Sequence, residues 1–251
     1  MIKQYSLEWG GKTLSVEIGK IAKQANGSCT VRYGDTVVLV TATMGAGREG
    51  IDFLPLSVEC EERLYAAGKI KSSRFMKREG RPTDDAVIVG RTIDRSIRPL
   101  FDAKIRKEIQ VVFTTLAFDK ENDYDVPAMI GASVALGISD IPWGGPIGGI
   151  RVGRVGGEWV INPSYDAREK GDLEVFLAGT PELTTMVEAE ASEASEADMF
   201  AAIAFGAKHL NEIQTFIKGI IADAGAYGAG EGVVDGDERV GVDGDGAAVV
   251  V

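Results

Sequence analysis

The sequence predicts an α+β fold, and three observations lead to it. Two hairpin signals open the chain, because the turns Gly10-Gly11 and Gly34-Asp35 each join segments rich in β-branched and aromatic residues. Residues 36–44 are apolar on both faces of a strand, so we expect burial on both sides. Apolar residues at helical spacing follow near Thr83 and again over residues 196–222. Antiparallel strands followed by helices are typical of α+β domains.

The remaining elements are read in chain order. Residues 64–81 have no steady period and contain glycines and serines, which predicts a long loop of the kind that is often functional. The helix that begins after Thr83 has Asp84 and Asp85 in its first turn, where the helix dipole favours acids. Further strands are predicted over residues 4–9, 12–19, 29–33, 53–61, 108–118, 149–155, 158–162, 172–179 and 184–191, and a helix of small residues over 126–139.

Composition limits the domain count and the chemistry. With 251 residues, 45% of them apolar, the chain is long enough for a substantial core, and we expect one core domain over residues 1–222. Residues 223–251 are rich in Gly and Asp and are predicted to be disordered. The single histidine, His209, nearly excludes Ser-His-Asp, Cys-His and multi-histidine metal chemistry.

Two further features bear on the compartment. Cys29 and Cys60 lie on strand-like segments without metal spacing, and we expect reduced core thiols, which suit a cytoplasmic protein. No apolar run approaches the roughly 18 residues that span a bilayer, and the N-terminus has no apolar signal region. The prediction is a cytoplasmic protein without membrane partners.

Residues 63–98 are basic within an acidic chain. They contain ten Lys or Arg against four Asp or Glu, whereas the whole chain has a formal net charge of −11. A local excess of this kind indicates a polyanion bound at one place, because general attraction to nucleic acid would need a basic protein. A solvated or internally paired arginine face is the alternative that composition leaves open.

The arrangement of these cations favours single-stranded nucleic acid. Arg91, Arg95 and Arg98 lie at i, i+4 and i+7, on one helix face. A guanidinium group can donate two parallel hydrogen bonds to the oxygens of one phosphate. The preceding loop alternates basic and apolar residues, so that bases can stack while cations follow the phosphates. The candidate RNA-binding residues of the loop are Arg74, Phe75, Met76, Lys77, Arg78 and Arg81.

Three long motifs resemble the polynucleotide phosphorylase family. They are LYAAGKI at 64–70, RFMKREGRP at 74–82 and RTIDRSIRPLF at 91–101. Shorter matches continue in order to about residue 222: GIDFLPL at 50–56, MIGAS at 129–133, SDIP at 139–142, GPIG at 145–148, VINP at 160–163 and MVEAE at 186–190. The chain is similar to the first ribonuclease PH-type core domain of that family.

The resemblance implies a ribosomal protein S5 domain 2-like β-α sandwich. It implies an enzyme that degrades RNA from the 3′ end with inorganic phosphate and Mg²⁺, releases nucleoside diphosphates and forms a homotrimeric ring. By position, residues 75–78 match the family's Phe-Phe-Arg-Arg channel loop, with Met76 in place of the second Phe. Arg91, Arg95 and Arg98 match the family's first-domain arginines near the catalytic centre, and we expect them to be catalytic here.

Two departures from the family pattern limit these expectations. No second core domain or KH and S1 domains are found, so full catalysis is expected to need an absent partner domain, and a non-catalytic module for RNA binding and ring assembly is the alternative. Asp166 and Asp172 fall where the family's second domain places its metal-binding aspartates. They could hold Mg²⁺, or they could be a surface residue and a strand-capping residue.

Overall fold

Two β-sheets form the frame of the protein. The computed structural model describes residues 2–47, 50–69, 82–180 and 182–225, together with the main chain of three short strands nearer the C-terminus. The larger sheet has the order β1-β2-β3-β4-β6-β5, in which only β5 and β6 are parallel. Its strands are β1 (Lys3–Trp9), β2 (Lys12–Ile18), β3 (Gly27–Tyr33), β4 (Thr36–Gly47), β5 (Leu56–Glu62) and β6 (Lys107–Ala117).

The smaller sheet is antiparallel throughout and has the order β10-β9-β7-β8. Its strands are β7 (Gly148–Val155), β8 (Glu158–Ile161), β9 (Leu173–Gly179) and β10 (Thr184–Ala191). The helices are α1 (Asp84–Ile97), α2 (Asp125–Gly137), α3 (Tyr165–Glu169) and α4 (Glu196–Ala224), with short 3-10 turns η1 (Leu64–Ala67) and η2 (Arg98–Leu100).

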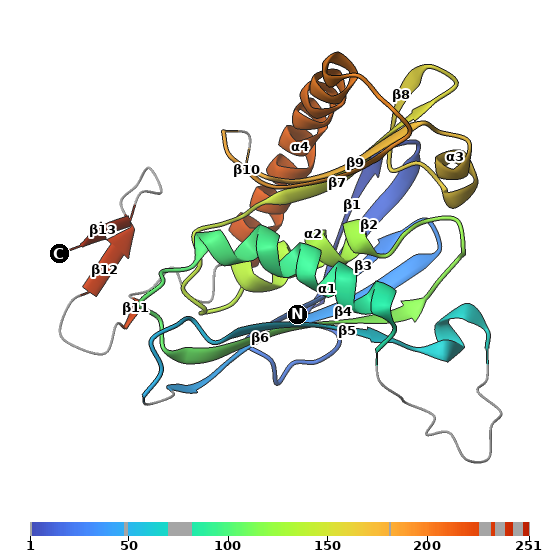
Figure 1. Ribbon diagram of the computed structural model, residues 1–251. Helices are drawn as coiled ribbons and strands as arrows, with labels where there is room; N and C mark the ends of the chain where they lie inside the picture. The colour runs from blue at the N-terminus through green and yellow to red at the C-terminus, as the bar shows by residue number, and fades with distance from the viewer. Residues whose placement is uncertain are drawn as a thin grey trace.

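Helices and sheets alternate in layers (Figure 1). Helix α2 lies between the sheets and contacts β3 and β4 on one side and β7 on the other, so twelve of its thirteen residues are buried. Helix α4 covers the outer face of the smaller sheet at β7 and β9. The small residues of α2 permit this close packing, because a Cβ at Gly131 would lie only 2.4 Å from a methyl carbon of Val40.

The predicted elements are confirmed in kind and order, with local differences. Gly10 and Gly11 both have positive φ in the β1–β2 turn, as a two-residue hairpin turn of type I′ requires. Burial of β4 on both faces was wrong: Val38 and Val40 are fully buried, but Val37 and Leu39 are only half-buried. Among the described residues, helices pack against only one face of this sheet, which explains the difference.

Two predictions concern segments that are described only in part. The loop expected over 64–81 begins with the single 3-10 turn η1, and residues 70–81 lie outside the described residues. Of the tail predicted to be disordered, the structure describes three short antiparallel strands, β11 (Gly232–Val233), β12 (Arg239–Val242) and β13 (Ala248–Val250), and the rest of that prediction lies outside the described residues. In the described part of the chain, no helix is long and apolar enough to cross a membrane.

Candidate nucleic-acid interface

Helix α1 carries the candidate cations and lies along strand β5. Thr83 caps its N-terminus by accepting a hydrogen bond from the Ala86 amide at 3.1 Å. Ile93 and Ile97 are fully buried and fix the inner face of the helix. The helical spacing therefore turns Arg91 and Arg95 toward solvent, where both side chains are exposed.

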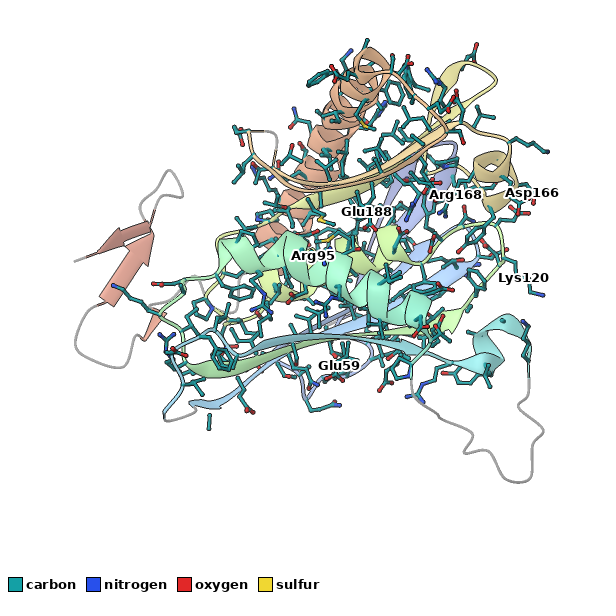
Figure 2. The ribbon with its side chains drawn as sticks, viewed as in Figure 1. Glu59, Arg95, Lys120, Asp166, Arg168 and Glu188 are labelled. Carbon is teal, nitrogen blue, oxygen red and sulfur yellow. The ribbon has the colours of Figure 1, made fainter. Side chains whose placement is uncertain are left out.

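Arg91 and Arg95 border a hollow of about 430 Å³ between α1 and the start of β5. In the described part of the chain, neither guanidinium has a carboxylate within ion-pair distance. Figure 2 shows Arg95 projecting from α1. Two cations without acidic partners beside one hollow are suited to binding an anion. The other residues that line the hollow are Leu56, Ser57, Val58, Gly90, Asp94 and Arg98.

Arg98 also lines the hollow but has a different environment. Its Nε and Nη2 atoms donate to the two carboxylate oxygens of Asp94 at 3.1 and 2.6 Å. Nη2 also donates to the carbonyl of Leu56 at 3.0 Å, and Nη1 donates to that of Leu54 at 3.4 Å. The structure thus brings the three predicted arginines to one place, but only Arg91 and Arg95 lack acidic partners among the described residues.

The remaining predicted RNA-binding residues lie in the loop before α1. Arg74, Phe75, Met76, Lys77, Arg78 and Arg81 all fall outside the described residues, so their role stays a prediction.

The two predicted metal ligands, Asp166 and Asp172, do not belong to any cluster that could hold a metal ion in the described part of the chain. Arg154 donates to both carboxylate oxygens of Asp172, from Nε at 2.8 Å and from Nη2 at 2.6 Å. This hydrogen bonding lowers the pKa of Asp172. Asp166 is exposed on α3, well away from Arg95 on α1 (Figure 2). Within the described ranges, no group of three His, Cys, Asp or Glu side chains could hold a metal ion, so this donor set does not fit a resident Mg²⁺.

A buried charge network was missed by the sequence reasoning. Arg151 of β7 forms ion pairs with Asp125 and Glu174 and lies over the ring of Phe176 at 5.7 Å. Arg168 of α3 pairs with Glu174 and, at 2.8 Å, with Asp123. Burial raises the pKa of Asp125 despite the nearby Arg151. The members lie far apart in the chain and share no motif, so no local signal could have predicted the network.

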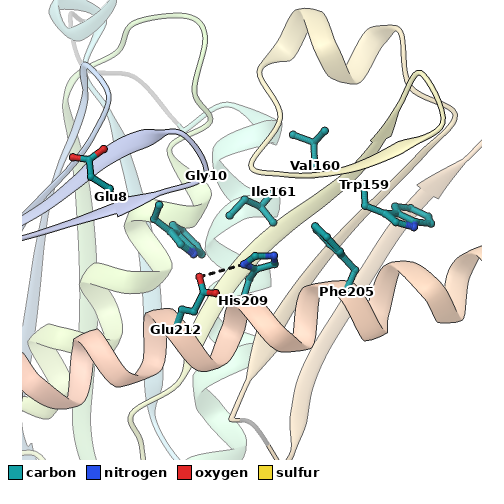
Figure 3. A pocket seen from close by; sticks show the side chains of 9 residues that line it. Glu8, Gly10, Trp159, Val160, Ile161, Phe205, His209 and Glu212 are labelled. Carbon is teal, nitrogen blue, oxygen red and sulfur yellow. Dashed lines mark hydrogen bonds and ion pairs between the residues drawn. The ribbon is translucent and has the colours of Figure 1, made fainter.

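A second hollow, of about 320 Å³, lies between the β1–β2 turn, β8 and α4 (Figure 3). Trp159 and Phe205 contribute aromatic rings, and the His209 ring lies 4.9 Å from that of Phe205. His209 Nδ1 lies 3.2 Å from a carboxylate oxygen of Glu212. Acids at this hollow, Glu8 and Glu212, make it unsuited to a polyanion.

Both cysteines are buried and reduced, as predicted. Burial raises the pKa of Cys29 and of Cys60 to about 12. A thiol with such a pKa is not a nucleophile at neutral pH. The arginine surface on α1 therefore remains the candidate with the clearest chemistry.

The chain belongs to the 3′ exoribonuclease family. Residues 10–142 match domain 1 of that family and residues 145–209 match domain 2. The first segment holds most of the larger sheet with α1 and α2, and the second holds the smaller sheet and the first half of α4. The resemblance noted from the motifs is confirmed.

The similar curated proteins are polyribonucleotide nucleotidyltransferases. The one from Ruminiclostridium cellulolyticum is 50% identical over 226 residues, which is 90% of this chain and 32% of that protein. The one from Heliobacterium modesticaldum is 52% identical over 222 residues, covering 88% of this chain and 31% of that protein. The chain thus spans about a third of the length of these relatives.

A solved structure has the same fold. The crystal structure of Rrp46 from rice (Oryza sativa) superposes with a TM-score of 0.67 at 15% identity, and the match covers 88% of this chain and 94% of Rrp46. At this identity the likeness shows the ribonuclease PH-type fold alone.

Proposed function

We propose that this chain is the RNA-binding first core domain, residues 1–222, of a phosphate-dependent 3′-to-5′ exoribonuclease that releases nucleoside diphosphates. The observation that carries the proposal is the pair Arg91 and Arg95, exposed beside a hollow and without acidic partners among the described residues. The names of the similar polyribonucleotide nucleotidyltransferases support the same reaction.

The chemistry gives these two arginines a specific task. Attack of inorganic phosphate, the proposed co-substrate, on a phosphodiester brings two anions together. Guanidinium groups held beside the reacting phosphates reduce that repulsion and orient the RNA backbone. Arg91 and Arg95 would supply this effect, and the loop residues 74–78 would guide the strand towards them.

The described residues do not supply the rest of a catalytic centre. In the described ranges no carboxylate cluster suits Mg²⁺, and Asp172 is held by Arg154. Full catalysis is therefore proposed to depend on a second core domain. The working form of the enzyme is proposed to be a homotrimeric ring in the cytoplasm. The lack of a described carboxylate cluster and the pairing of Asp172 with Arg154 fit a second candidate equally well. This candidate is a non-catalytic module that binds single-stranded RNA and helps assemble the ring.

Two measurements on the 251-residue chain test these candidates. Fluorescence anisotropy with labelled oligo(A) should show binding whose affinity falls by roughly 0.7 log unit per log unit of salt for each phosphate contacted. Incubation with poly(A), inorganic phosphate and Mg²⁺ should then be assayed for ADP. Salt-dependent binding without ADP agrees with both candidates, because full catalysis is proposed to need the second core domain, whereas ADP production would exclude the non-catalytic module. Binding that is absent or independent of salt would refute both candidates.

A further inference from the structure

Arg98 is held by four hydrogen bonds that join helix α1 to the strand beside it. Two of these bonds go to Asp94, one turn earlier on α1. The other two go to the carbonyl of Leu56, the first residue of β5, and to that of Leu54, two residues before it. A guanidinium has five N–H donors, so four of the five are in use. The side chain is 40% exposed, yet little of its donor capacity remains for a ligand.

The Leu56 carbonyl lies on the outer edge of the larger sheet, and the Leu54 carbonyl lies just before that edge strand begins. Among the described residues, β5 is the last strand of that sheet and pairs with β6 alone. The Ile109 amide of β6 donates to the Pro55 carbonyl at 3.0 Å, so the peptide group of Pro55 faces β6. Because peptide groups alternate in direction along a strand, the carbonyl of Leu56 faces away from β6, toward α1. The Leu54 carbonyl, just before the strand, also accepts a hydrogen bond from the Leu56 amide at 2.9 Å. Arg98 supplies the Leu56 carbonyl with a donor that no further strand provides in the described part of the chain.

The same contacts fix the shape of the hollow beside Arg91 and Arg95. One wall is β5 at Leu56, Ser57 and Val58, and the other is α1. Arg98 links both walls at one end, and its charge is balanced by Asp94, whose side chain is 25% exposed. A guanidinium paired in this way adds little net attraction for a polyanion, whereas its removal would let the walls separate.

We infer that Arg98, together with Asp94, is a positioning residue: it holds α1 against the edge of β5 and so sets where Arg91 and Arg95 meet the RNA backbone. The inference rests on the proposed function, because it assigns Arg98 a task at the same anion-binding surface. It replaces direct contact of Arg98 with RNA, which the sequence predicted.

The variant Asp94→Asn distinguishes a positioning role of Asp94 from a purely electrostatic one, because the two roles predict opposite changes in oligo(A) affinity. Removal of a negative charge beside a polyanion site should tighten binding by roughly fivefold, if charge alone matters. If Asp94 positions the arginines through Arg98, the same variant should weaken oligo(A) binding by about tenfold, since a charge-assisted hydrogen bond is lost. Asp94→Glu, which can rebuild a carboxylate pair at this i, i+4 spacing, should restore most of the affinity.

A matched control removes a carboxylate from a pair elsewhere. Asp35 forms an exposed ion pair with Arg32 three residues earlier, at the turn between β3 and β4. Asp35→Asn should leave oligo(A) affinity unchanged. The unfolding midpoint of every variant is measured, so that a loss of affinity can be separated from a loss of folded protein.

Arg98→Lys gives an independent test if Asp94→Asn does not fold. Lysine keeps the charge but, as a single point donor, cannot reach Asp94 and both carbonyls together. A positioning role predicts a loss of about tenfold in affinity, since hydrogen bonds to a charged group are lost. Wild-type affinity in Arg98→Lys, or wild-type or tighter affinity in Asp94→Asn, would overturn the inference. Failure of the proposed function is a different outcome: wild-type protein that does not bind oligo(A), or Arg95→Ala without effect.

Discussion

Gly90 of α1 lies against the main chain of Val58 in β5. A Cβ built at Gly90 would be 3.3 Å from the Val58 carbonyl oxygen and 4.0 Å from the Cys60 amide nitrogen. A glycine inside a helix costs stability, so its presence here fits the close approach of α1 to β5. This approach determines the depth of the hollow that Arg91 and Arg95 border.

The first prediction compares Gly90 of α1 with Gly219 of α4, both inside helices. Gly219→Ala in α4 should stabilise the protein by about 0.5–1 kcal/mol, because alanine favours helix and no atom lies within 4 Å of its Cβ. Gly90→Ala should not stabilise the protein in this way, since β5 must move to accept the methyl group. The affinity for oligo(A) should fall as well. Urea denaturation measures the first effect and anisotropy the second. Equal stabilisation by both substitutions would show that the approach at Gly90 is not tight.

The second prediction concerns the two exposed arginines. Arg91→Ala and Arg95→Ala should each weaken oligo(A) binding by roughly 10–100-fold, the range expected for a lost hydrogen bond to a charged group. Each should also reduce the salt slope by about 0.7 if one phosphate contact is lost. Lys218→Ala provides the control, because Lys218 is an exposed cation on α4, which packs on the other sheet. The same loss in the control would mean that overall charge, rather than this surface, binds the RNA.

The third prediction concerns the buried network around Arg151. Arg151→Leu leaves the buried Asp125 without its main cation and removes one of the two arginines that pair with Glu174, which should cost about 3–5 kcal/mol of unfolding free energy. Arg32→Leu, which removes an exposed pair, should cost under about 1 kcal/mol. Urea denaturation of both variants measures the difference. A similar small cost for both would show that the network contributes no more than a surface pair.

The sequence predicted the elements whose signals are local. The hairpin turn at Gly10 and Gly11, the cap at Thr83 and the apolar stripe of α1 depend on residues close in the chain, and all three are confirmed. The short helix α3 was not predicted, because five residues are too few for a helical period to show. The half-buried face of β4 was also misjudged, because apolar content says nothing about which layers cover a strand.

The sequence predicted only the part of the candidate site that helical spacing determines. The i, i+4, i+7 pattern placed Arg91, Arg95 and Arg98 together, and all three border the same hollow. It could not separate Arg98 from the others, because its partners include carbonyls more than forty residues earlier in the chain. For the same reason, the Asp172–Arg154 pair could not be predicted from the sequence, since Arg154 is eighteen residues earlier, on strand β7, which pairs with β9.

The fourth prediction uses that pair to test the suggested metal site. The pKa of Asp172 is lowered by the hydrogen bonds from Arg154, so ionised Asp172 stabilises the folded state. This contribution is present above the unfolded pKa of about 3.9 and is lost as pH falls through the lower folded value. Asp172→Asn should therefore lower the unfolding midpoint at pH 7, and the difference from wild type should shrink below about pH 4.

Asp166→Asn is the matched variant for this test, because Asp166 is exposed and no ion pair involving it is found among the described residues. It should leave the midpoint unchanged at both pH values. Millimolar Mg²⁺ should shift the midpoints of wild type and of both variants equally, since Arg154 already occupies both oxygens of Asp172. A Mg²⁺-dependent rise in the wild-type midpoint that both Asp166→Asn and Asp172→Asn abolish would instead place a metal between these two carboxylates, and the Arg154 pair would then have to open to admit it.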